Sequence, residues 1–553
     1  MDVKRLFLII SLALVSYLMV VQWNKDYGPQ AQAPVVQNTL PSSASPSAAT
    51  NASEDIPQNT ARGELAVNSE ASTSLIEVRT NVLDLRIDPK GGDIVYAALP
   101  QHTARVDTPD IPFVLLERSK NRTYVAQSGL AGVNGPDASR NGRPLFSTEK
   151  SSYELTESAD SLQVDLNFVQ ESGVEITKRF ILQRDSYNIR VEYLINNASS
   201  ETWSGYYFAQ LKRDNSPDPT QAEGMGMVSY LGAAISTANE KYEKITFQDI
   251  QEADVKRESV GGWVAMIQHY FVSSWIPDQN IKQEYSTRST SRGDNIVGFS
   301  SPETQLQPGE QATLGSNLYV GPKVQEQLEA AAPNLELTVD FGWLWFIAQP
   351  LFWMLNLIHG FLGNWGWAII VLTVMIKAAF FHLSASAYRS MANMRRVGPE
   401  LQRMKEKYGE DRQKMSQAMM ELYKKEKINP IGGCLPILIQ MPVFIALYWM
   451  LMESVELRHA PFMLWIDDLS VKDPYFVLPI IMGASMFIQQ LLNPTPPDPM
   501  QAKLMKMLPV VFTVFFLWFP AGLVVYWVVN NILSIAQQYV ITKRIEQGDG
   551  KKA

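Results

Sequence analysis

A single lysine, Lys377, is the residue most able to do chemistry in a long apolar part of the sequence. It carries the only formal charge among the 48 residues between Asp340 and Arg389. A lysine at the centre of a membrane span costs roughly 2.5–3.5 kcal/mol on insertion scales. Two interpretations remain open: the side chain extends to the cytoplasmic interface, or it lies in a water-filled cavity open to the cytoplasm. Lys377 lies well inside the predicted span that runs from Trp367 to Ser384, and this position favours the cavity.

Uncharged polar residues recur in the same apolar segments and predict a shared polar groove. Thr373 precedes Lys377 by four residues and falls on the same helix face. Each residue alone is equally consistent with hydrogen bonding between helices. Together with one unpaired lysine they fit a groove better than a dry helix bundle. The other predicted groove residues are Gln440, Asn530, Ser534 and Gln537.

The segment 384–430 is rich in methionine and basic residues and predicts a helical hairpin interrupted at Gly409. Flexible thioethers suit a surface that meets many apolar sequences, and packing inside the hairpin is the alternative. The basic residues could face anionic lipid or ribosomal RNA, or simply solvent. The candidate hairpin residues are Met391, Met394, Arg395, Arg396, Met404, Met415 and Met419.

Composition excludes several classes of site. A single cysteine, Cys434, and five scattered histidines leave no basis for a disulfide or a zinc centre. The motifs HExxH, GxSxG, GxxxxGK[ST] and GxGxxG do not occur. We therefore expect no catalytic residues, metal or cofactor, no enzymatic activity, and no sequence-specific nucleic-acid partner.

Charge distribution orients the elements that hold these residues. Residues 24–340 carry 41 acidic and 26 basic residues, and the rest of the chain is net +7. The loop 389–427 has 11 Lys/Arg, whereas 453–474 has two, so the positive-inside rule places the first in the cytoplasm and the second outside. One crossing then fits between 341 and 388. We predict that 341–362, with Trp343, Trp345 and Trp353, is an interfacial amphipathic helix.

The complete prediction is a polytopic α-helical membrane protein with six spans, both termini in the cytoplasm and a large domain outside. Residues 1–24 form a transmembrane anchor, with a cleaved signal peptide as the alternative. The proline-containing, aromatic-poor segment 25–74 is a disordered linker. Period-two alternation, as in Leu162, Val164 and Leu166, predicts an antiparallel β-sandwich over 75–340. Residues 363–543 form a five-span core, and 544–553 a cytoplasmic tail.

Two unusual strings carry a family resemblance. One is Asn429-Pro430-Ile431-Gly432-Gly433-Cys434-Leu435-Pro436, and the other is Phe515-Phe516-Leu517-Trp518-Phe519-Pro520-Ala521-Gly522-Leu523. The chain resembles the YidC-type membrane protein insertases in their Gram-negative form. This resemblance implies a five-helix insertase core, a periplasmic β-sandwich and a location in the bacterial inner membrane. It departs at Lys377, where the family often has arginine.

The resemblance also implies what the protein does and with which partners. An insertase moves nascent membrane proteins into the bilayer, alone or with the Sec translocon and its accessory subunits. The cytoplasmic hairpin is expected to meet the ribosome and the signal recognition machinery, and the core to contact membrane lipid. The alternative is a polytopic solute transporter with a periplasmic receptor domain, which predicts inverted repeats. No internal repeat is visible in the sequence.

Overall fold

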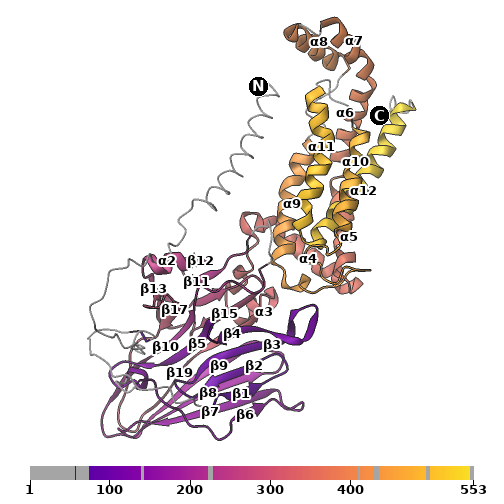
Figure 1. The fold of residues 1–553 in the computed structure, drawn as a ribbon. Helices are drawn as coiled ribbons and strands as arrows, with labels where there is room; N and C mark the ends of the chain where they lie inside the picture. The colour runs from indigo at the N-terminus through magenta and orange to yellow at the C-terminus, as the bar shows by residue number, and fades with distance from the viewer. Residues whose placement is uncertain are drawn as a thin grey trace, which may run out of the picture. The chain divides into compact units, whose positions relative to one another are not determined.

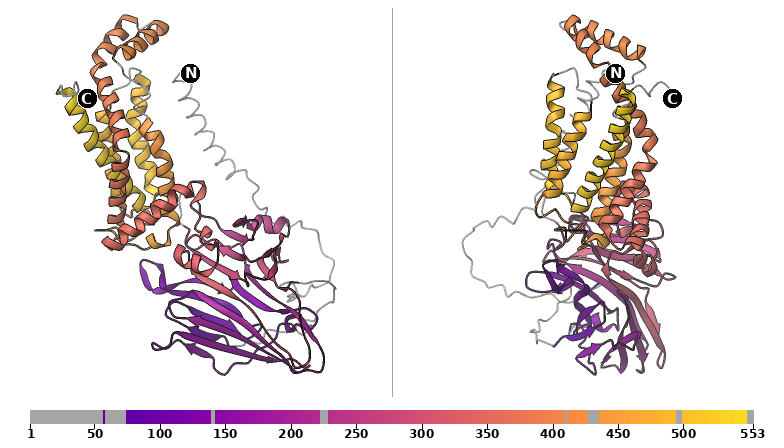
Figure 2. Two further views of the ribbon diagram at one scale, coloured as in Figure 1. Left: turned by 180° about the vertical axis from the view of Figure 1, so that it is seen from behind. Right: turned by 90° about the vertical axis from the view of Figure 1, so that its right-hand side faces the viewer.

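The computed structural model describes residues 56–57, 74–138, 142–221, 228–408, 411–426, 435–493 and 499–547. The predicted anchor at 1–24, nearly all of the predicted linker at 25–74, Gly409 and Cys434 lie outside the described residues. Asn51–Ala553 forms one compact unit, which holds a β domain followed by a helical part (Figures 1 and 2).

The β domain contains two large sheets. In spatial order, the eleven strands of the first are β13 (Lys256–Val260), β16 (Lys282–Ser289), β17 (Asn295–Ser300), β10 (Trp203–Arg213), β5 (Thr123–Ala131), β4 (Thr108–Arg118), β3 (Asp93–Arg105), β2 (Asp84–Asp88), β1 (Ile76–Arg79) and β6 (Ser152–Glu154), with β18 (Thr304–Leu306) paired to β10. The eight of the second are β12 (Glu243–Ile245), β11 (Gly232–Ser236), β14 (Trp263–Ile267), β15 (Phe271–Ile276), β19 (Gln311–Pro322), β9 (Asn188–Asn197), β8 (Val174–Gln183) and β7 (Ser161–Val169).

Alternating side chains close these sheets into a sandwich, as predicted. Val164 and Leu166 of β7 are fully buried, whereas Asp165 between them is partly exposed. The sheets also bond across the core: the Trp275 indole N–H donates to the Gln210 carbonyl at 2.9 Å. Pairing is antiparallel except between β1 and β6, which run parallel. The predicted β-sandwich is therefore confirmed, with one parallel edge pair.

The helical part follows short helices that lead out of the β domain. The short elements are η1 (Pro136–Ala138), α2 (Phe247–Glu252), α3 (Gln325–Ala331), η2 (Leu335–Thr338) and η3 (Gly342–Leu344). The remaining helices are α4 (Trp345–Leu362), α5 (Trp365–Ala379), α6 (Phe381–Arg396), α7 (Gly398–Tyr408), α8 (Arg412–Lys425), α9 (Leu435–Glu453), η4 (Val455–Leu457), α10 (Val477–Leu492), α11 (Pro499–Phe515), η5 (Phe516–Trp518) and α12 (Ala521–Glu546).

A break near Pro520 separates α11 from α12. Proline has no backbone N–H and favours the first turn of a helix. The following amides are satisfied by a neighbouring loop: Ala521 N–H donates to the Val471 carbonyl at 2.7 Å, and Gly522 N–H to the Leu469 carbonyl at 2.9 Å. These bonds fix the start of α12 against the loop that precedes α10.

The apolar helices differ in length. Gly342–Leu362 and Ala521–Ile545 are each long and apolar enough to cross a membrane. Trp365–Ala379 and Phe381–Arg396 would form one further crossing only as a broken span, because the pair bends by 67°. Ile439–Glu453 and Val477–Leu492 are apolar but shorter. Length alone therefore leaves the six-span arrangement, and the interfacial position of 341–362, as predictions.

Two structural boundaries differ from the sequence expectation. The helix holding Lys377 ends at Ala379, and no glycine or proline at 379–382 signals that bend. The hairpin was expected over 384–430, but α6 packs along α12, and the hairpin itself consists of α7 and α8. Figure 1 shows these two helices at the end of the helical part opposite α4. Within the described residues the hairpin thus begins at α7, and residues 427–430 of the predicted segment lie outside them.

Candidate polar groove

The polar groups of the helical part meet along one face of α12. The Lys377 ammonium group on α5 donates to the Ser534 hydroxyl at 2.7 Å, and Ser534 donates in turn to the Asn530 carbonyl at 2.7 Å. The partner of the lysine is thus a hydroxyl and not a carboxylate. Ser534 is buried and Lys377 is half-buried. Because Lys377 has no ion-pair partner among the described residues, its charge retains an attraction for an acidic group.

The helix α9 joins the same face one turn away. The Gln440 side-chain amide donates to the Asn530 side-chain oxygen at 2.6 Å and lies 3.4 Å from the Tyr526 hydroxyl. Tyr526, Asn530 and Ser534 are spaced by four residues, so they share one side of α12. We call the set Lys377, Gln440, Tyr526, Asn530 and Ser534 the polar seam.

The structure places the other predicted groove residues differently. Thr373 is buried, and its hydroxyl donates to the Ile369 carbonyl within its own helix at 2.7 Å. Gln537 donates from its amide to the Phe381 carbonyl at 3.0 Å, where α5 gives way to α6. Gln537 therefore lies at the bend beyond Lys377. The hydroxyl of Thr373 makes its hydrogen bond within α5 and does not take part in the seam.

Two tyrosines of this region were not found by sequence reasoning. Tyr526 touches Gln440, and the Tyr388 hydroxyl on α6 is hydrogen-bonded to Ser534. Tyrosine is common at membrane interfaces, so its presence in an apolar segment gave little signal. The spacing of Tyr526 four residues before Asn530 was the available clue.

The side of α12 that faces α10 carries polar residues with structural partners. The Asn531 amide donates to the Ser485 hydroxyl at 2.9 Å, and the Gln538 amide donates to the Asn493 side chain at 2.9 Å. Both contacts join α12 to α10 or to the residue just after it. These residues hold two helices together through partners that are not part of the polar seam.

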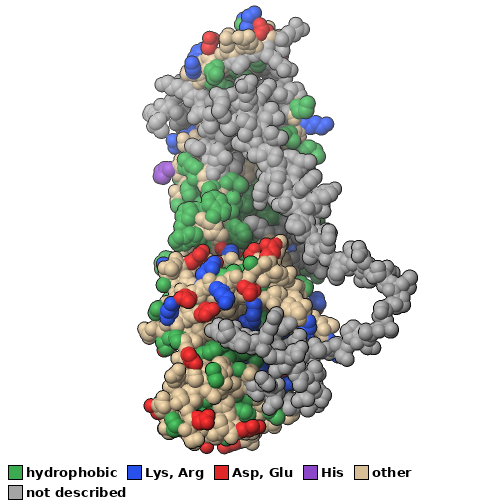
Figure 3. All heavy atoms as spheres, turned by 90° about the vertical axis from the view of Figure 1, so that its left-hand side faces the viewer, with side chains coloured by type: hydrophobic (Ala, Val, Ile, Leu, Met, Phe, Trp, Pro, Cys, Tyr) green, Lys and Arg blue, Asp and Glu red, His purple; other side chains and the backbone are tan. Residues whose placement is uncertain are grey.

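Apolar side chains cover the outside of the helical part. Figure 3 shows them gathered over the helices, while charged side chains are frequent on the β domain and near the hairpin. An exposed apolar surface of this extent is stable only in contact with lipid or another apolar surface. The exposed residues of α10 and α11 include Ile480, Phe487, Ile488, Leu491, Leu504, Met507, Val510 and Val514.

The hairpin and the end of α6 share a small core. Val397, Leu401 and Leu422 are buried, and Met394, Met404 and Met419 pack against them. Met391 and Met415 are only partly exposed, whereas Met420 is 58% exposed. Arg395 and Arg396 at the end of α6 are exposed. Packing thus accounts for three of the five candidate methionines.

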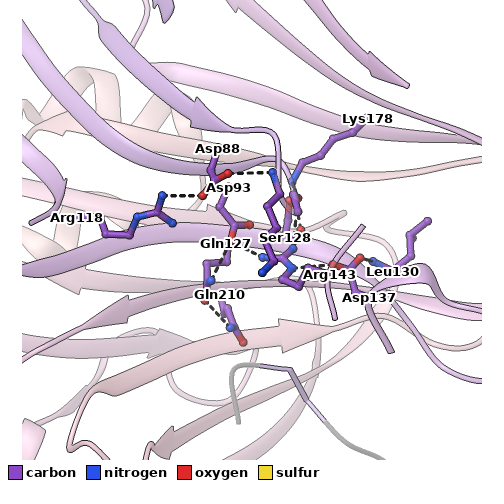
Figure 4. A network of polar contacts seen from close by, with 12 residues as sticks. Asp88, Asp93, Arg118, Gln127, Ser128, Leu130, Asp137, Arg143, Lys178 and Gln210 are labelled. Atoms are coloured by element: carbon purple, nitrogen blue, oxygen red, sulfur yellow. Dashed lines mark hydrogen bonds and ion pairs between the residues drawn. The ribbon is translucent and has the colours of Figure 1, made fainter. Parts of the chain in front are cut away.

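The β domain holds a buried ionic network. Arg143 pairs with Asp93 and with Asp137, the latter at 2.7 Å, and Lys178 donates to the Ser128 carbonyl at 3.2 Å (Figure 4). Two basic side chains thus face two carboxylates in a dry interior. The described residues contain no cluster of three or more His, Cys, Asp or Glu suited to a metal ion. The network joins the two sheets.

Comparison with known proteins covers both parts of the chain. A family model described as the YidC periplasmic domain matches residues 75–354, and one described as the 60Kd inner membrane protein matches residues 357–548. The membrane protein insertase YidC of Stutzerimonas stutzeri (strain A1501) is 57% identical over 99% of this chain and 99% of its own length. The protein of the same name from Pseudomonas syringae pv. syringae (strain B728a) is 56% identical over 100% of both chains.

A solved structure, described as an active YidC insertase with its first transmembrane domain resolved, is 16% identical. The match covers 85% of this chain and 93% of the chain in that structure, with a TM-score of 0.38. The curated relatives are insertases and not transporters, so they give the transporter alternative no support. With matches to both family models and relatives more than half identical over its whole length, this chain belongs to the YidC family of inner-membrane protein insertases, which have a periplasmic domain and are not enzymes.

Proposed function

We propose that this insertase admits the hydrophilic segment of a nascent membrane protein at the polar seam. One observation carries the proposal: Lys377 of α5 and Gln440 of α9 meet Asn530 and Ser534 along one face of α12. A polar surface partway through the membrane lowers the cost of moving a short hydrophilic tail across. The lysine attracts acidic residues in that tail.

The apolar part of the substrate leaves along the exposed surfaces of the helices. Side chains such as Ile480 on α10 and Val510 on α11 are exposed and apolar, so they match lipid tails as well as an incoming helix. No nucleotide-binding motif occurs in the chain, so we infer that hydrophobic transfer and the membrane potential drive insertion. The polar seam then acts as a temporary substitute for water.

We further propose six spans, with both termini in the cytoplasm and α4 along the outer interface. The exposed side of α4 carries Trp345, Phe346, Trp353 and Phe361, and tryptophan favours the interfacial depth. Its other side packs against α5 and α9. The basic loop containing α7 and α8 is then cytoplasmic, in line with the positive-inside rule.

The proposed partners follow from this arrangement. Nascent membrane proteins are the clients of the family. Arg395 and Arg396 are exposed beside the hairpin and could contact ribosomal RNA, the signal recognition machinery or anionic lipid. The Sec translocon and its accessory subunits are the proposed partners within the membrane.

Photocrosslinking from single positions tests the polar seam directly. A photoreactive residue at 440 or 534 should capture the hydrophilic tail of a ribosome-bound single-span substrate. The same residue at 531, which faces α10, is the matched control and should capture it much less. Equal capture from all three positions would contradict the proposed path.

A further inference from the structure

The outer end of α9 is held by side chains of the β domain. The last carbonyl groups of a helix have no partner within the helix. The Met452 carbonyl accepts a hydrogen bond of 2.9 Å from His269 Nε2, in the turn between β14 and β15. Glu453 Oε2 lies 3.0 Å from the Lys323 ammonium group, which follows β19. The last turn of α9 thus receives two partners from another part of the chain.

His269 is fixed for this contact. Its backbone N–H donates to Asp218 at 2.6 Å, and its ring stacks on Tyr270 with ring centres 3.8 Å apart. A carbonyl only accepts hydrogen bonds, so Nε2 carries the proton. The other nitrogen, Nδ1, is buried and has no hydrogen-bond partner among the described residues. The ring therefore binds Met452 in its neutral form.

Lys323 provides the second contact. Its side chain is 1% exposed and that of Glu453 is 2% exposed, so the pair is shielded from water. The ammonium group also donates to the Thr338 carbonyl at 3.2 Å. A cation near the negative end of a helix is favourable, and removing one member of a buried pair is strongly unfavourable. The pair thus ties the end of α9 to the segment that leaves the β domain.

We infer that His269 and Lys323 form a cap on α9 that sets the position of Gln440 against Asn530. About 13 residues separate Gln440 from Glu453, which is roughly 20 Å of helix. Pro442 interrupts the backbone ladder beside Gln440, so the outer part of α9 needs an anchor of its own. His269 and Lys323 are positioning residues, and the inference deepens the proposed function because it rests on the role given to Gln440.

The cap has a predictable response to acid. Burial lowers the pKa of His269, and the charged groups facing it are Glu453, Lys323 and Asp218. A histidine with a depressed pKa stabilises the folded arrangement fully above its unfolded pKa of about 6.5. That stability is lost as the pH falls toward the lower folded value, because protonated Nδ1 has no acceptor. The contact between α9 and the β domain should therefore loosen below about pH 6.

Bridging between α9 and α12 tests the cap without any substrate. In a Cys434→Ala background, Gln440→Cys and Asn530→Cys provide two thiols for a short bifunctional reagent. At pH 7.5, His269→Leu should slow bridging at least about fivefold, because a buried carbonyl loses its donor. His269→Gln keeps a donor in place of Nε2 and should bridge like the parent. The exposed Lys282→Met is a control and should change nothing.

The pH profile separates the cap from a general packing defect. The ratio of each variant's rate to the parent's at the same pH cancels the intrinsic pH dependence of thiol reactivity. His269→Gln should bridge faster than the parent at pH 5.5, since it cannot be protonated. Lys323→Met should slow bridging, and the exchanged pair Lys323→Glu with Glu453→Lys should restore part of the rate.

Two outcomes overturn the inference: unchanged bridging in both His269→Leu and Lys323→Met, or the same loss at pH 5.5 in His269→Gln as in the parent. Protease resistance of the β domain shows that each variant is folded. Insertion is measured separately on the same variants, without the two cysteines. Altered bridging with normal insertion would support the cap and count against the role of Gln440. Unchanged bridging rejects the cap whatever happens to insertion.

Discussion

The polar residues of α12 form two groups that face different neighbouring helices. Only the group that faces α5 and α9 belongs to the groove. Asn530 meets Gln440, whereas its neighbour Asn531 meets Ser485 on α10. One residue along a helix rotates a side chain by about 100°, so adjacent asparagines face different partners. The sequence identified Gln440, Asn530 and Ser534 as candidates. It could not pair them, because pairing depends on how the helices pack.

The contact between Gln440 and Asn530 should be measurable as a coupling energy. In a double-mutant cycle of Gln440→Ala and Asn530→Ala, we expect a coupling of roughly 0.6–1.7 kcal/mol in the free energy of unfolding. Gln440→Ala combined with Asn531→Ala is the matched control and should be additive. The measurement is denaturant unfolding in lipid or detergent bicelles. Additive effects in both cycles would show that the 2.6 Å contact contributes nothing.

At the scale of elements, regular patterns were predictable and irregular joints were not. Strands such as β7 and β9 follow from their period-two alternation, and the break before α12 follows from Pro520. The bend at Phe380 has no such signal in the sequence, and the helices on both sides of it pack against α12. Since α6 packs against α12, the hairpin begins at α7 rather than at residue 384.

The turn between β2 and β3 shows why its glycines are needed. Gly91 and Gly92 adopt φ values of +81° and +66°, and a Cβ at these positions would meet Arg143 and Lys178 respectively. The two long cations therefore pass directly over the backbone. The turn thereby makes room for a buried network, which no local sequence pattern indicates.

Lys178 should make the stability of the β domain depend on pH. Burial lowers the pKa of Lys178 to about 7, whereas the unfolded value is about 10.4. The unfolded chain then binds more protons between these values, so stability rises as the pH increases from 7. We expect the urea midpoint, followed by tryptophan fluorescence, to increase from pH 7 to pH 9. Lys178→Met should remove the increase, and Lys282→Met should keep it.

At the scale of the whole molecule, the charge distribution predicts which parts lie on each side of the membrane. The basic helices α7 and α8 contrast with the acidic loop at 453–474 and with the acidic β domain. The identity and full coverage of the relatives establish the family and its periplasmic domain. The number of spans is a separate matter, because several apolar helices are shorter than a bilayer requires.

Cysteine labelling tests this topology. In a Cys434→Ala background, single cysteines at exposed positions within 100–330 and 455–470 should react with a membrane-impermeant reagent added outside intact cells. Cysteines in α7 and α8 should react only after the membrane is opened. External labelling of α7 or α8 would contradict the six-span arrangement and the interfacial position of α4.

The central claim is that the charge of Lys377 attracts the acidic tail of a substrate. Two charges 4–6 Å apart interact by roughly 3–4 kcal/mol at an effective dielectric of about 20, and water in the groove lowers this to about 1–2 kcal/mol. Lys377→Glu should therefore slow insertion of an acidic tail about five- to thirtyfold. Lys377→Arg keeps the positive charge, so it should change the insertion rate very little.

The most direct measurement is the insertion rate of one single-span substrate whose tail carries zero, one or two aspartates. The wild-type protein, Lys377→Arg and Lys377→Glu are compared after reconstitution. We predict that the slowing caused by Lys377→Glu grows with each added aspartate and is small for the neutral tail. Equal slowing of all three tails, or no slowing of any, would contradict the claim that Lys377 guides the substrate by its charge.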